Sequence, residues 1–416
     1  MLSVSEALSK VLANTGRKPP ARAPLAESLG LALAEDVISD IDSPPHDKAM
    51  VDGYALVAAD LAAGAAELSI LEEVTAGAVP MLAVSSGQCT RIMTGAPLPA
   101  GADAVVMVER TEMMLESARV RIVDEAKPRQ NIMAQGSSLR YGDVVLHVGQ
   151  EIRPAEIGLL AEVGRAEVTV FPAPRVAVLS TGNELVEAGV RPDLGQIRNS
   201  NGPLLAAAVR RAGGIPVELG IARDEVRDLR KKVEQGLAAD VLVLSGGVSA
   251  GVLDLVPSVL QEMGVEQVFH KVNLKPGKPL WFGVAGSKFK VQGSKFKVTE
   301  GEHGTLVFGV PGNPVSSLVC FELFVQPAIA KLGGRDPDAG LRRLPARLAS
   351  EFTHRGERPT YFPVVIRREG EGLWAEPVRW RGSADLRGIT RANGLIVFPA
   401  GDRTWQAGEQ FEVLLL

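Results

Sequence analysis

The stretch LSGGVSAGVLD, residues 244–254, joins a strongly apolar segment to a run of glycine and serine that ends in Asp254. The residues before it, DVLV at 240–243, are typical of a strand buried on both faces of a parallel sheet. The residues after it, LDLVPSVLQEMG from position 253, have the apolar spacing of a helix. The stretch therefore predicts a strand, a glycine-rich turn and a helix, which together form the repeating unit of open α/β sheets.

The same alternation extends over residues 174–332. RVAVLSTG (175–182) precedes a helical pattern at 203–213, and IPVELGIA (215–222) precedes another at 224–239. Continuous apolar strands that alternate with amphipathic helices predict a parallel sheet covered on both faces. Ligands of such a sheet bind beyond the carboxyl ends of its strands.

The flanking sequence has a different pattern. Short alternating segments such as DAVVMVER (103–110) stand between glycine and proline clusters, and the tail contains short strands such as GLIVFPAG (394–401). We therefore expect a multidomain α/β plus β protein. Its parts are a discontinuous elongated segment at 1–40 and 140–173, an inserted β-rich domain at 41–139, an α/β domain at 174–332 and a C-terminal β domain at 333–416.

Composition excludes several classes of protein. The net charge of −4 over 416 residues argues against a broad basic surface for nucleic acid or an anionic membrane. Cys89 and Cys320 lie far apart without a second cysteine at metal-ligand spacing, so neither a disulfide framework nor a zinc site is expected. We find no signal-peptide pattern and no run of about 18 apolar residues, which predicts a cytoplasmic protein without a membrane span.

The glycine-rich turn has the residues that a phosphate group requires. Gly246 and Gly247 would let the backbone approach a ligand and expose N–H groups, and the hydroxyls of Ser245 and Ser249 could donate to an oxyanion. Asp254 would repel a phosphate unless a hard cation such as Mg²⁺ lay between them. An aspartate at the start of a helix is equally well explained as its N-cap, and both explanations can hold together.

Three further loops follow strands of the same predicted sheet. Glu184 lies in STGNEL (180–185), and the polar residues 199–201 precede a helix, where capping is the favoured explanation. Lys275 and Lys278 flank a proline-stiffened turn, KPGKP, which suits a dianion although lysines in surface turns are usually only solvated. GVPGNPVSS (309–317) completes the set. Four such loops at one edge of one sheet predict a binding site there.

Outside this domain the local signals are weaker. Asp52 precedes Gly53 in MVDGYAL, a pattern that usually marks only a turn, and Thr94 lies in another turn-rich segment. Histidine spacings typical of metal sites are missing, as are the G-x-S-x-G and Walker A motifs, so hydrolase and P-loop functions gain no support. Cys320 lies in an apolar helix and is expected in the core.

Taken in order, the motifs MVDGYAL, TGAPLPAGADAVVMVE, STGNEL, SGGVSAGVLD, KPGKPLWFG and GVPGNPVSS resemble the MoeA family and the E domain of gephyrin, the molybdopterin molybdenumtransferases. The resemblance spans residues 1–416. It implies four subdomains and the insertion of molybdate into the dithiolene of adenylylated molybdopterin, with Mg²⁺-assisted loss of AMP. It also implies a homodimer whose inserted domain contributes to the partner's site.

The resemblance also implies roles for individual residues. It places Asp52, Thr94, Glu184, Asp224 and Asp254 in the catalytic set, with Glu184 and Asp254 as Mg²⁺ ligands. It assigns substrate binding to Ser245, Gly246, Gly247, Ser249, Lys275, Lys278, Pro311, Pro314, Ser316, Arg358 in ERPTYF and Ser383 in WRGSADL. The chain departs from the family pattern at Ser138, where an acidic residue is usual, and at Ala49, where a serine is usual.

Two alternatives remain. A molybdopterin adenylyltransferase resembles residues 174–332 alone, so the flanking domains argue against it. A non-catalytic scaffold, which the gephyrin comparison suggests, would have no reason to hold Glu184, Asp224 and Asp254 near a cleft at the strand ends.

Overall fold

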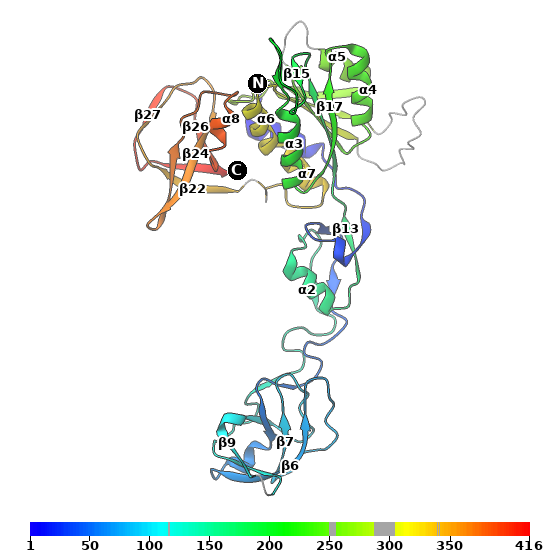
Figure 1. Ribbon diagram of the computed structural model, residues 1–416, viewed down its shortest axis with the longest axis vertical. Coiled ribbons are helices and arrows are strands. Elements are labelled where there is room, and N and C mark those ends of the chain that lie inside the picture. The colour runs from blue at the N-terminus through cyan, green and yellow to red at the C-terminus, as the bar shows by residue number, and fades with distance from the viewer. Residues whose placement is uncertain (115–116, 249–254, 287–303, 339, 341) are drawn as a thin grey trace. The chain divides into compact units, whose positions relative to one another are not determined.

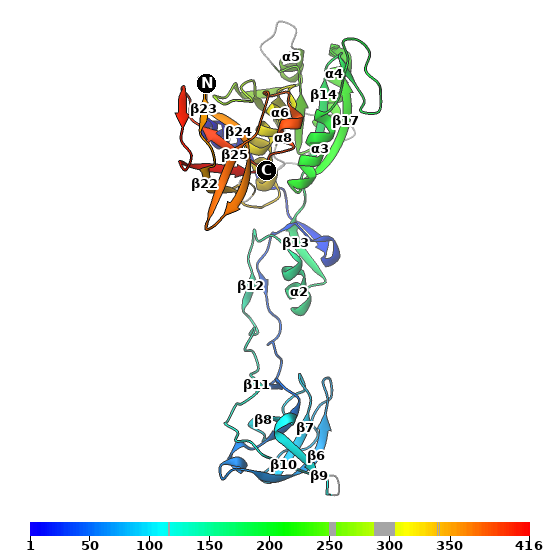
Figure 2. The same ribbon diagram turned by 60° about the vertical axis from the view of Figure 1, so that its left-hand side comes forward.

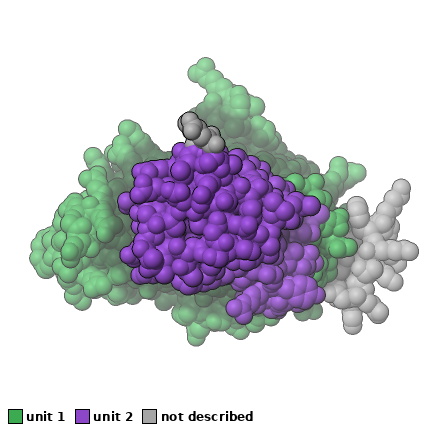
Figure 3. Space-filling model, turned by 90° about the horizontal axis from the view of Figure 1, so that it is seen from below, with its two compact units in different colours: residues 1–35, 148–157, 167–416 green, residues 36–147, 158–166 purple. Residues whose placement is uncertain are grey.

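The structure is a computed structural model that describes residues 1–416 except 115–116, 249–254, 287–303, 339 and 341. The chain forms two compact units (Figure 3). Unit 1 comprises residues 1–35, 148–157 and 167–416, and unit 2 comprises residues 36–147 and 158–166. Unit 2 is therefore an insertion, as the sequence pattern indicates, while the boundaries predicted at 41 and 139 stay a prediction.

A six-stranded sheet organises unit 1 (Figure 1). Its order is β17 (Ile215–Ala222), β14 (Arg175–Thr181), β18 (Val241–Ser245), β21 (Thr305–Val310), β20 (Trp281–Ala285) and β19 (Val265–His270). The first four strands are parallel, as predicted, but β20 runs antiparallel to both of its neighbours, β21 and β19, so β19 again has the direction of the first four strands. The segment between β19 and β20 is only residues 271–280, too short for the crossover that parallel neighbours require, so the sheet is mixed rather than wholly parallel.

Apolar side chains cover both faces of this sheet. Along β14, Val176 and Val178 pack into one core, and Ala177 and Leu179 pack into the other, because successive side chains of a strand point to opposite faces. The first core lies against α1 (Val4–Ala13), α3 (Asn201–Arg211), α6 (Pro314–Cys320) and α7 (Gln326–Leu332), and the second lies against α4 (Val226–Gly236) and α5 (Leu255–Glu262). The strand sequences are therefore continuously apolar, as a sheet covered on both faces requires.

The helix at Pro314–Leu332 contains Cys320, which the sequence places in an apolar helix of the core. It combines α6, the π-helical turn η4 (Phe321–Val325) and α7, and it is long and apolar enough to cross a membrane, with a mean hydropathy of 1.5 in an 18-residue window. In the structure 83% of that window is buried, which is the environment of a core helix.

The C-terminal residues form a closed five-stranded barrel (Figure 2). Its order is β22 (Arg343–Leu348), β25 (Gly372–Pro377), β24 (Thr360–Glu369), β26 (Gly394–Phe398) and β28 (Gln410–Leu415), with the short helix α8 (Leu386–Ile389) before β26. Aromatic rings fill the barrel, including the stacked pair Phe352 and Phe398 at 4.9 Å between centroids. Tyr361, Leu395 and Leu414 join the core that covers one face of the central sheet, so barrel and sheet domain share one hydrophobic core.

Near its N-terminus, unit 1 also contains a small antiparallel sheet of β1 (Ala21–Pro24), β13 (Glu167–Phe171) and β2 (Ala32–Leu33). This sheet joins residues from the beginning of the chain to residues near 170. The discontinuous segment expected at 1–40 and 140–173 stays a prediction.

Unit 2 is β-rich, as predicted (Figure 2). Its six-stranded sheet has the order β8 (Ala104–Met107), β5 (Gly53–Leu56), β7 (Gln88–Ile92), β6 (Ala66–Val74), β10 (Arg119–Ile122) and β9 (Thr111–Met114). Two-stranded ladders pair β4 (Lys48–Ala49) with β11 (Ile132–Met133) and β3 (Val37–Ile38) with β12 (Val144–Leu146). Cys89 lies in the core of this unit, where burial raises the pKa of its thiol to about 12.

An ion pair between a buried carboxylate and a half-exposed arginine joins the π-helical turn to the end of α3. The carboxyl of Glu322, 4% exposed, accepts a hydrogen bond from the Arg211 guanidinium, which is 49% exposed. Burial raises the pKa of Glu322, and the charge of Arg211 partly opposes this rise. The arginine therefore neutralises a carboxylate that the core would otherwise not tolerate.

We expect Arg211→Met to lower the free energy of unfolding by about 3 kcal/mol at neutral pH, because it leaves a buried carboxylate without its partner. A raised folded-state pKa means that stability is lost as the pH rises through that pKa, so the loss should shrink in acid, where Glu322 is protonated. Urea unfolding at several pH values measures this. Arg210→Met, which breaks an exposed pair with Glu218, is the control and should cost less than about 1 kcal/mol. Equal losses for both variants would contradict the assignment.

Candidate functional site

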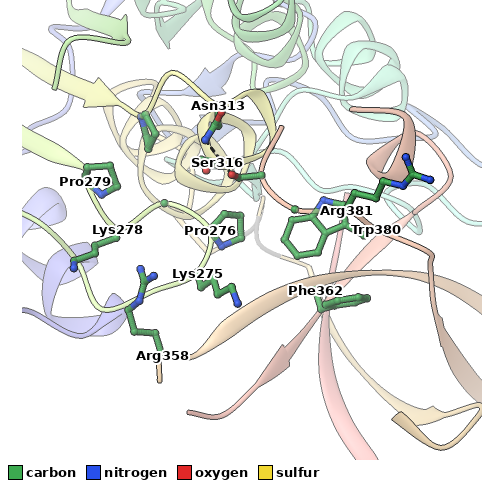
Figure 4. Close-up of a pocket in the computed structure, with 14 residues that line it drawn as sticks. Lys275, Pro276, Lys278, Pro279, Asn313, Ser316, Arg358, Phe362, Trp380 and Arg381 are labelled. Carbon is green, nitrogen blue, oxygen red and sulfur yellow. Dashed lines mark hydrogen bonds between the residues drawn. The ribbon is translucent and has the colours of Figure 1, made fainter. Parts of the chain in front are cut away.

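Two adjoining cavities open in unit 1, and Pro279, Pro311 and Asn313 line both of them. One, here called the cationic cavity, has a volume of about 560 Å³ (Figure 4). The other, here called the glycine-loop cavity, has a volume of about 690 Å³ and lies at the carboxyl ends of β14 and β18. The position agrees with the edge at which an open α/β sheet binds its ligands.

The turn KPGKP between β19 and β20 forms one wall of the cationic cavity. Its central residue, Gly277, has a φ of +121°, and a Cβ there would lie 2.7 Å from Sγ of Cys320 and 2.9 Å from Cδ1 of Leu274. Only glycine fits this position. Cys320 is buried on α6, and burial raises the pKa of its thiol, so it is a core residue as expected. The turn is thereby held against helix α6 with Lys275 and Lys278 on either side of the glycine.

Backbone hydrogen bonds join this turn to the barrel. The Lys275 N–H donates to the Pro359 carbonyl at 2.8 Å, and the Tyr361 N–H donates to the Lys275 carbonyl at 2.7 Å. Arg358 also donates from Nη1 to the Leu274 carbonyl at 2.8 Å. Arg358 therefore lies beside the two lysines although more than 80 residues separate them in sequence, and its remaining N–H groups can reach a ligand (Figure 4).

Two hydroxyls complete the cationic cavity. Ser316, 4% exposed, lies in the first turn of α6, and Ser383 lies in the loop before α8. The Val315 N–H donates to the Ser383 carbonyl, and Nδ2 of Asn313 donates to Oγ of Ser383, both at 3.0 Å. The structure thus brings together five of the residues to which the resemblance assigns substrate binding: Lys275, Lys278, Ser316, Arg358 and Ser383.

The glycine-rich turn lines the second cavity, with one difference from expectation. Gly246 and Gly247 have positive φ values of +91° and +63°, and a Cβ on Gly246 would lie 2.7 Å from the Thr181 carbonyl oxygen. However, the Gly246 N–H donates to the Val310 carbonyl at 3.1 Å and is not free for a ligand. Close approach of the chain, rather than an exposed N–H, therefore explains glycine at this position.

Ser245 also has an internal partner. Its hydroxyl donates to Oγ of Ser180 at 3.3 Å, and that hydroxyl in turn donates to Oδ1 of Asn199 at 2.9 Å. The Gly202 N–H, in the first turn of α3, also donates to Oδ1 of Asn199, whereas the N-cap residue Ser200 makes no side-chain capping hydrogen bond. Ser249 and Asp254 lie outside the described residues, and their roles stay predictions.

Two carboxylates face the glycine-loop cavity. Glu184 follows β14 and Asp224 follows β17, and both residues line the cavity. The Asn183 N–H donates to Oδ2 of Asp224 while the Asp224 N–H donates to Oδ1 of Asn183, both at 3.1 Å. Arg223 donates to the Asn183 and Leu185 carbonyls, also at 3.1 Å. These contacts tie the two loops together and place both carboxylates on the same cavity.

The donor set of this cavity fits a magnesium ion that is shared with a phosphate. The described residues contain no group of three or more histidine, cysteine, aspartate or glutamate side chains that could hold a metal alone. Mg²⁺ usually takes one or two carboxylates and completes its shell with water and substrate phosphates. Glu184 and Asp224 supply that number of carboxylates.

Asp52 and Thr94 lie together in unit 2. Asp52 precedes β5 and Thr94 follows β7, and both the N–H and Oγ1 of Thr94 donate to Oδ1 of Asp52 at 2.7 Å. These two hydrogen bonds lower the pKa of Asp52, which keeps its carboxylate charged. The aspartate therefore has a specific partner in addition to its place in a turn.

The cavities also contain residues that sequence reasoning missed. Pro311 and Pro314 line the glycine-loop cavity as implied, but so does Arg198, and the cationic cavity includes Phe362, Trp380 and Arg381. Three of these residues belong to the motifs that contain Arg358 and Ser383, because Phe362 ends ERPTYF while Trp380 and Arg381 begin WRGSADL. Their positions next to predicted binding residues could have identified them.

Comparison with protein families covers most of the chain. Residues 2–164 match the MoeA N-terminal region (domain I and II), residues 177–331 match a probable molybdopterin binding domain, and residues 345–416 match the MoeA C-terminal region (domain IV).

Individual relatives match over nearly their full lengths. A molybdopterin molybdenumtransferase of Staphylococcus aureus (strain Mu50) is 31% identical over 100% of this chain and 95% of its own, and molybdopterin molybdenumtransferase 2 of Mycobacterium tuberculosis is 34% identical over 95% and 94%. The crystal structure of a molybdopterin biosynthesis MoeA protein from Pyrococcus horikoshii has a TM-score of 0.80 and 32% identity over 100% of this chain and 99% of its own. The chain therefore belongs to the MoeA family of molybdopterin molybdenumtransferases.

Proposed function

We propose that this chain is a molybdopterin molybdenumtransferase that inserts molybdate into adenylylated molybdopterin and releases AMP. The names of its full-length relatives support this activity. The observation that carries it is the cationic cavity, in which Lys275, Lys278 and Arg358 lie with two serine hydroxyls around one space. Such a set suits a small tetrahedral dianion.

The cationic cavity would bind molybdate and prepare its oxygens to leave. Lysine ammonium groups act as compact charges, and the Arg358 guanidinium adds directed donors. Ser316 and Ser383 can donate hydrogen bonds to the same oxygens. These groups lower the negative charge on the oxygens as the two dithiolene sulfurs bind molybdenum and one oxygen leaves as water with the two thiol protons. Donors fixed before the reaction need no reorganisation.

The glycine-loop cavity would bind the nucleotide part of the substrate. Gly246 and Gly247 leave space for a phosphate close to the backbone, and Glu184 and Asp224 would hold Mg²⁺ beside it. When bound, the metal would neutralise charge that develops as the phosphoanhydride is cleaved. The junction at Pro279, Pro311 and Asn313 allows one substrate to reach both cavities.

This proposal extends to assembly and location. We place the protein in the cytoplasm as a homodimer, with Asp52 and Thr94 of each subunit contributing to the partner's site. The described residues that line both cavities all belong to unit 1, so Asp52 and Thr94 are not among them.

The alternatives explain fewer observations. An adenylyltransferase would need only the region that resembles residues 174–332, whereas here the barrel contributes Arg358 and Ser383 to the cationic cavity. A scaffold without activity would have no use for three cations and two carboxylates in adjoining cavities.

The direct test is release of AMP from adenylylated molybdopterin by the purified protein. We expect release to require both molybdate and Mg²⁺, and we expect the product to activate a cofactor-free molybdoenzyme. Formation of the adenylylated compound from ATP and molybdopterin, without its consumption, would support the adenylyltransferase instead.

Lys275→Ala and Lys278→Ala should each raise the molybdate concentration for half-maximal activity by about tenfold or more, because each removes a cation that would bind the oxyanion directly. The affinity for AMP should change much less. Steady-state assays over molybdate and calorimetry with AMP separate the two effects. Lys271→Ala, four residues before the turn and outside the lining of both cavities, is the control. Equal losses for molybdate and AMP would assign the lysines to the phosphates.

Glu184→Gln and Asp224→Asn should raise the Mg²⁺ concentration for half-maximal AMP release by about tenfold or more, because each replaces a charged oxygen ligand by a neutral amide. The melting temperature should change little, since asparagine can still accept the Asn183 N–H. Magnesium titrations and thermal melts measure both quantities. Glu225→Gln, next to Asp224 but outside the cavity lining, should match the wild type. An unchanged Mg²⁺ dependence in both variants would exclude these carboxylates as ligands.

Mixed dimers test the shared site. Asp52→Ala and Glu184→Ala homodimers should be inactive, whereas verified heterodimers of the two variants should recover part of the activity, because one of their two sites has both native residues. Differently tagged subunits, refolded together and purified by both tags, allow this measurement. Inactive heterodimers would mean that each site is built within one chain.

A further inference from the structure

The cationic cavity has an aromatic wall that oxyanion binding does not explain. Phe362 and Trp380 line this cavity, and both side chains are half-buried. Figure 4 shows Lys275, Lys278 and Arg358 on one side of the cavity, with Trp380 and Phe362 on the other. A compact dianion uses the cations and hydroxyls but gains little from two ring faces. The wall therefore indicates a second, flat chemical group in the same cavity.

Packing fixes the two rings at a right angle. Their centroids lie 5.3 Å apart with an interplanar angle of 89°, the edge-to-face geometry that aromatic pairs favour. Phe362 also packs against Phe352, with 4.8 Å between the ring centroids. The wall is therefore continuous with the aromatic interior of the barrel. Rings that their neighbours already pack into place lose less entropy when a ligand stacks on them.

A purely structural role does not explain why residue 380 is a tryptophan, because its side chain lowers the stability of the fold. Its indole nitrogen is buried and has no hydrogen-bond partner among the described residues. An unpartnered buried N–H lowers stability, and a phenylalanine would avoid that cost. A tryptophan at this position is better explained by the large ring face that it offers to the cavity.

The two cavities differ in the aromatic residues that line them. The described residues that line the glycine-loop cavity include no phenylalanine, tyrosine or tryptophan, whereas the cationic cavity has both Phe362 and Trp380. A conjugated ring that enters the site therefore finds a stacking surface only beside the cations.

The chemistry of the substrate identifies the ring. In adenylylated molybdopterin the dithiolene carbons belong to a pyran ring that is fused to the pterin, while the nucleotide is attached through phosphate on the opposite side of that pyran. The dithiolene must reach the oxyanion in the cationic cavity. Because only the pyran ring separates the dithiolene from the pterin, the pterin has to lie about one ring width from the cations. The adenine is separated from it by the pyrophosphate and the ribose.

We propose that Trp380 and Phe362 form a pterin-binding subsite, so that the substrate lies with its pterin on the barrel wall and its nucleotide in the glycine-loop cavity. This assignment rests on the proposed function and adds the orientation of the substrate to it. Trp380 stacks on the heterocycle, and Phe362 holds the indole in place. Recognition by stacking alone tolerates either face of the pterin, so orientation comes from the cations and the glycine loop.

The test measures the dissociation constants of neopterin and AMP, two probes that separate the two ends of the substrate. Isothermal titration calorimetry is applied to the wild-type protein and to Trp380→Leu, Trp380→Phe and Trp374→Leu. Trp374 is a half-buried tryptophan of the same barrel that lines neither cavity, and it serves as the control. Thermal melts verify that each variant is folded, and Trp380→Phe keeps an aromatic ring if the leucine variant does not fold.

We expect Trp380→Leu to weaken neopterin binding about tenfold or more while AMP binding stays within twofold, because the variant loses a stacked ring but no polar contact. Trp380→Phe should retain neopterin binding within about threefold, and Trp374→Leu should leave both ligands unaffected. Loss of AMP binding instead would assign the wall to adenine. Absence of neopterin binding to the wild-type protein, or equal binding by all variants, would overturn the proposal.

The proposed function can fail independently of this subsite. A protein that binds neopterin through Trp380 but releases no AMP from adenylylated molybdopterin would keep the pterin subsite and lose the transferase reaction. A protein that releases AMP normally but binds neopterin equally well after Trp380→Leu would keep the reaction and lose the subsite.

Discussion

The site depends on the short ladder of backbone hydrogen bonds between Lys275 and the segment Pro359–Tyr361. The Lys275 N–H donates to the Pro359 carbonyl, and the Lys275 carbonyl accepts from the Tyr361 N–H. The Arg358 guanidinium adds a third hydrogen bond, to the carbonyl of Leu274. Three cations of like charge repel each other in a shared cavity, so side-chain interactions alone would not gather them. The backbone contacts, and the core that Tyr361 shares with the central sheet, hold the barrel in place against that repulsion.

This construction explains why both the sheet domain and the barrel are needed for one cavity. The turn before β20 supplies two lysines, the start of α6 supplies Ser316, and the barrel supplies Arg358 and Ser383. Glycine at 277 allows the turn to lie against Cys320, and glycine at 246 allows the neighbouring loop to lie against Thr181. The resulting donors are fixed before a substrate arrives, as effective electrostatic stabilisation requires.

Sequence patterns predicted the parts of the site that follow strands. The apolar run before Ser245 located the glycine loop, and the prolines around Gly277 located the lysine turn, because both signals are local. Local signals could not identify Asp224, since an aspartate before a helix suggests a cap, and Arg358 and Ser383 came only from family resemblance. Trp380 was missed because cavity lining depends on how distant segments meet.

The errors have equally physical causes. The reversed direction of β20 relative to β19 follows from the short connection between them rather than from the apolar pattern of either strand. The N–H of Gly246 is used by Val310, a partner from a strand more than 60 residues away.

The central claim is that the cations gathered by this backbone ladder form the oxyanion site. Anomalous diffraction from crystals soaked in tungstate, a heavy tetrahedral dianion similar in size to molybdate, would locate the ion directly. The account predicts one strong peak within hydrogen-bond distance of Lys275, Lys278, Arg358 and Ser316, and loss of that peak in crystals of Lys275→Ala. A peak beside Gly247 and Glu184, with the cationic cavity empty, would contradict it.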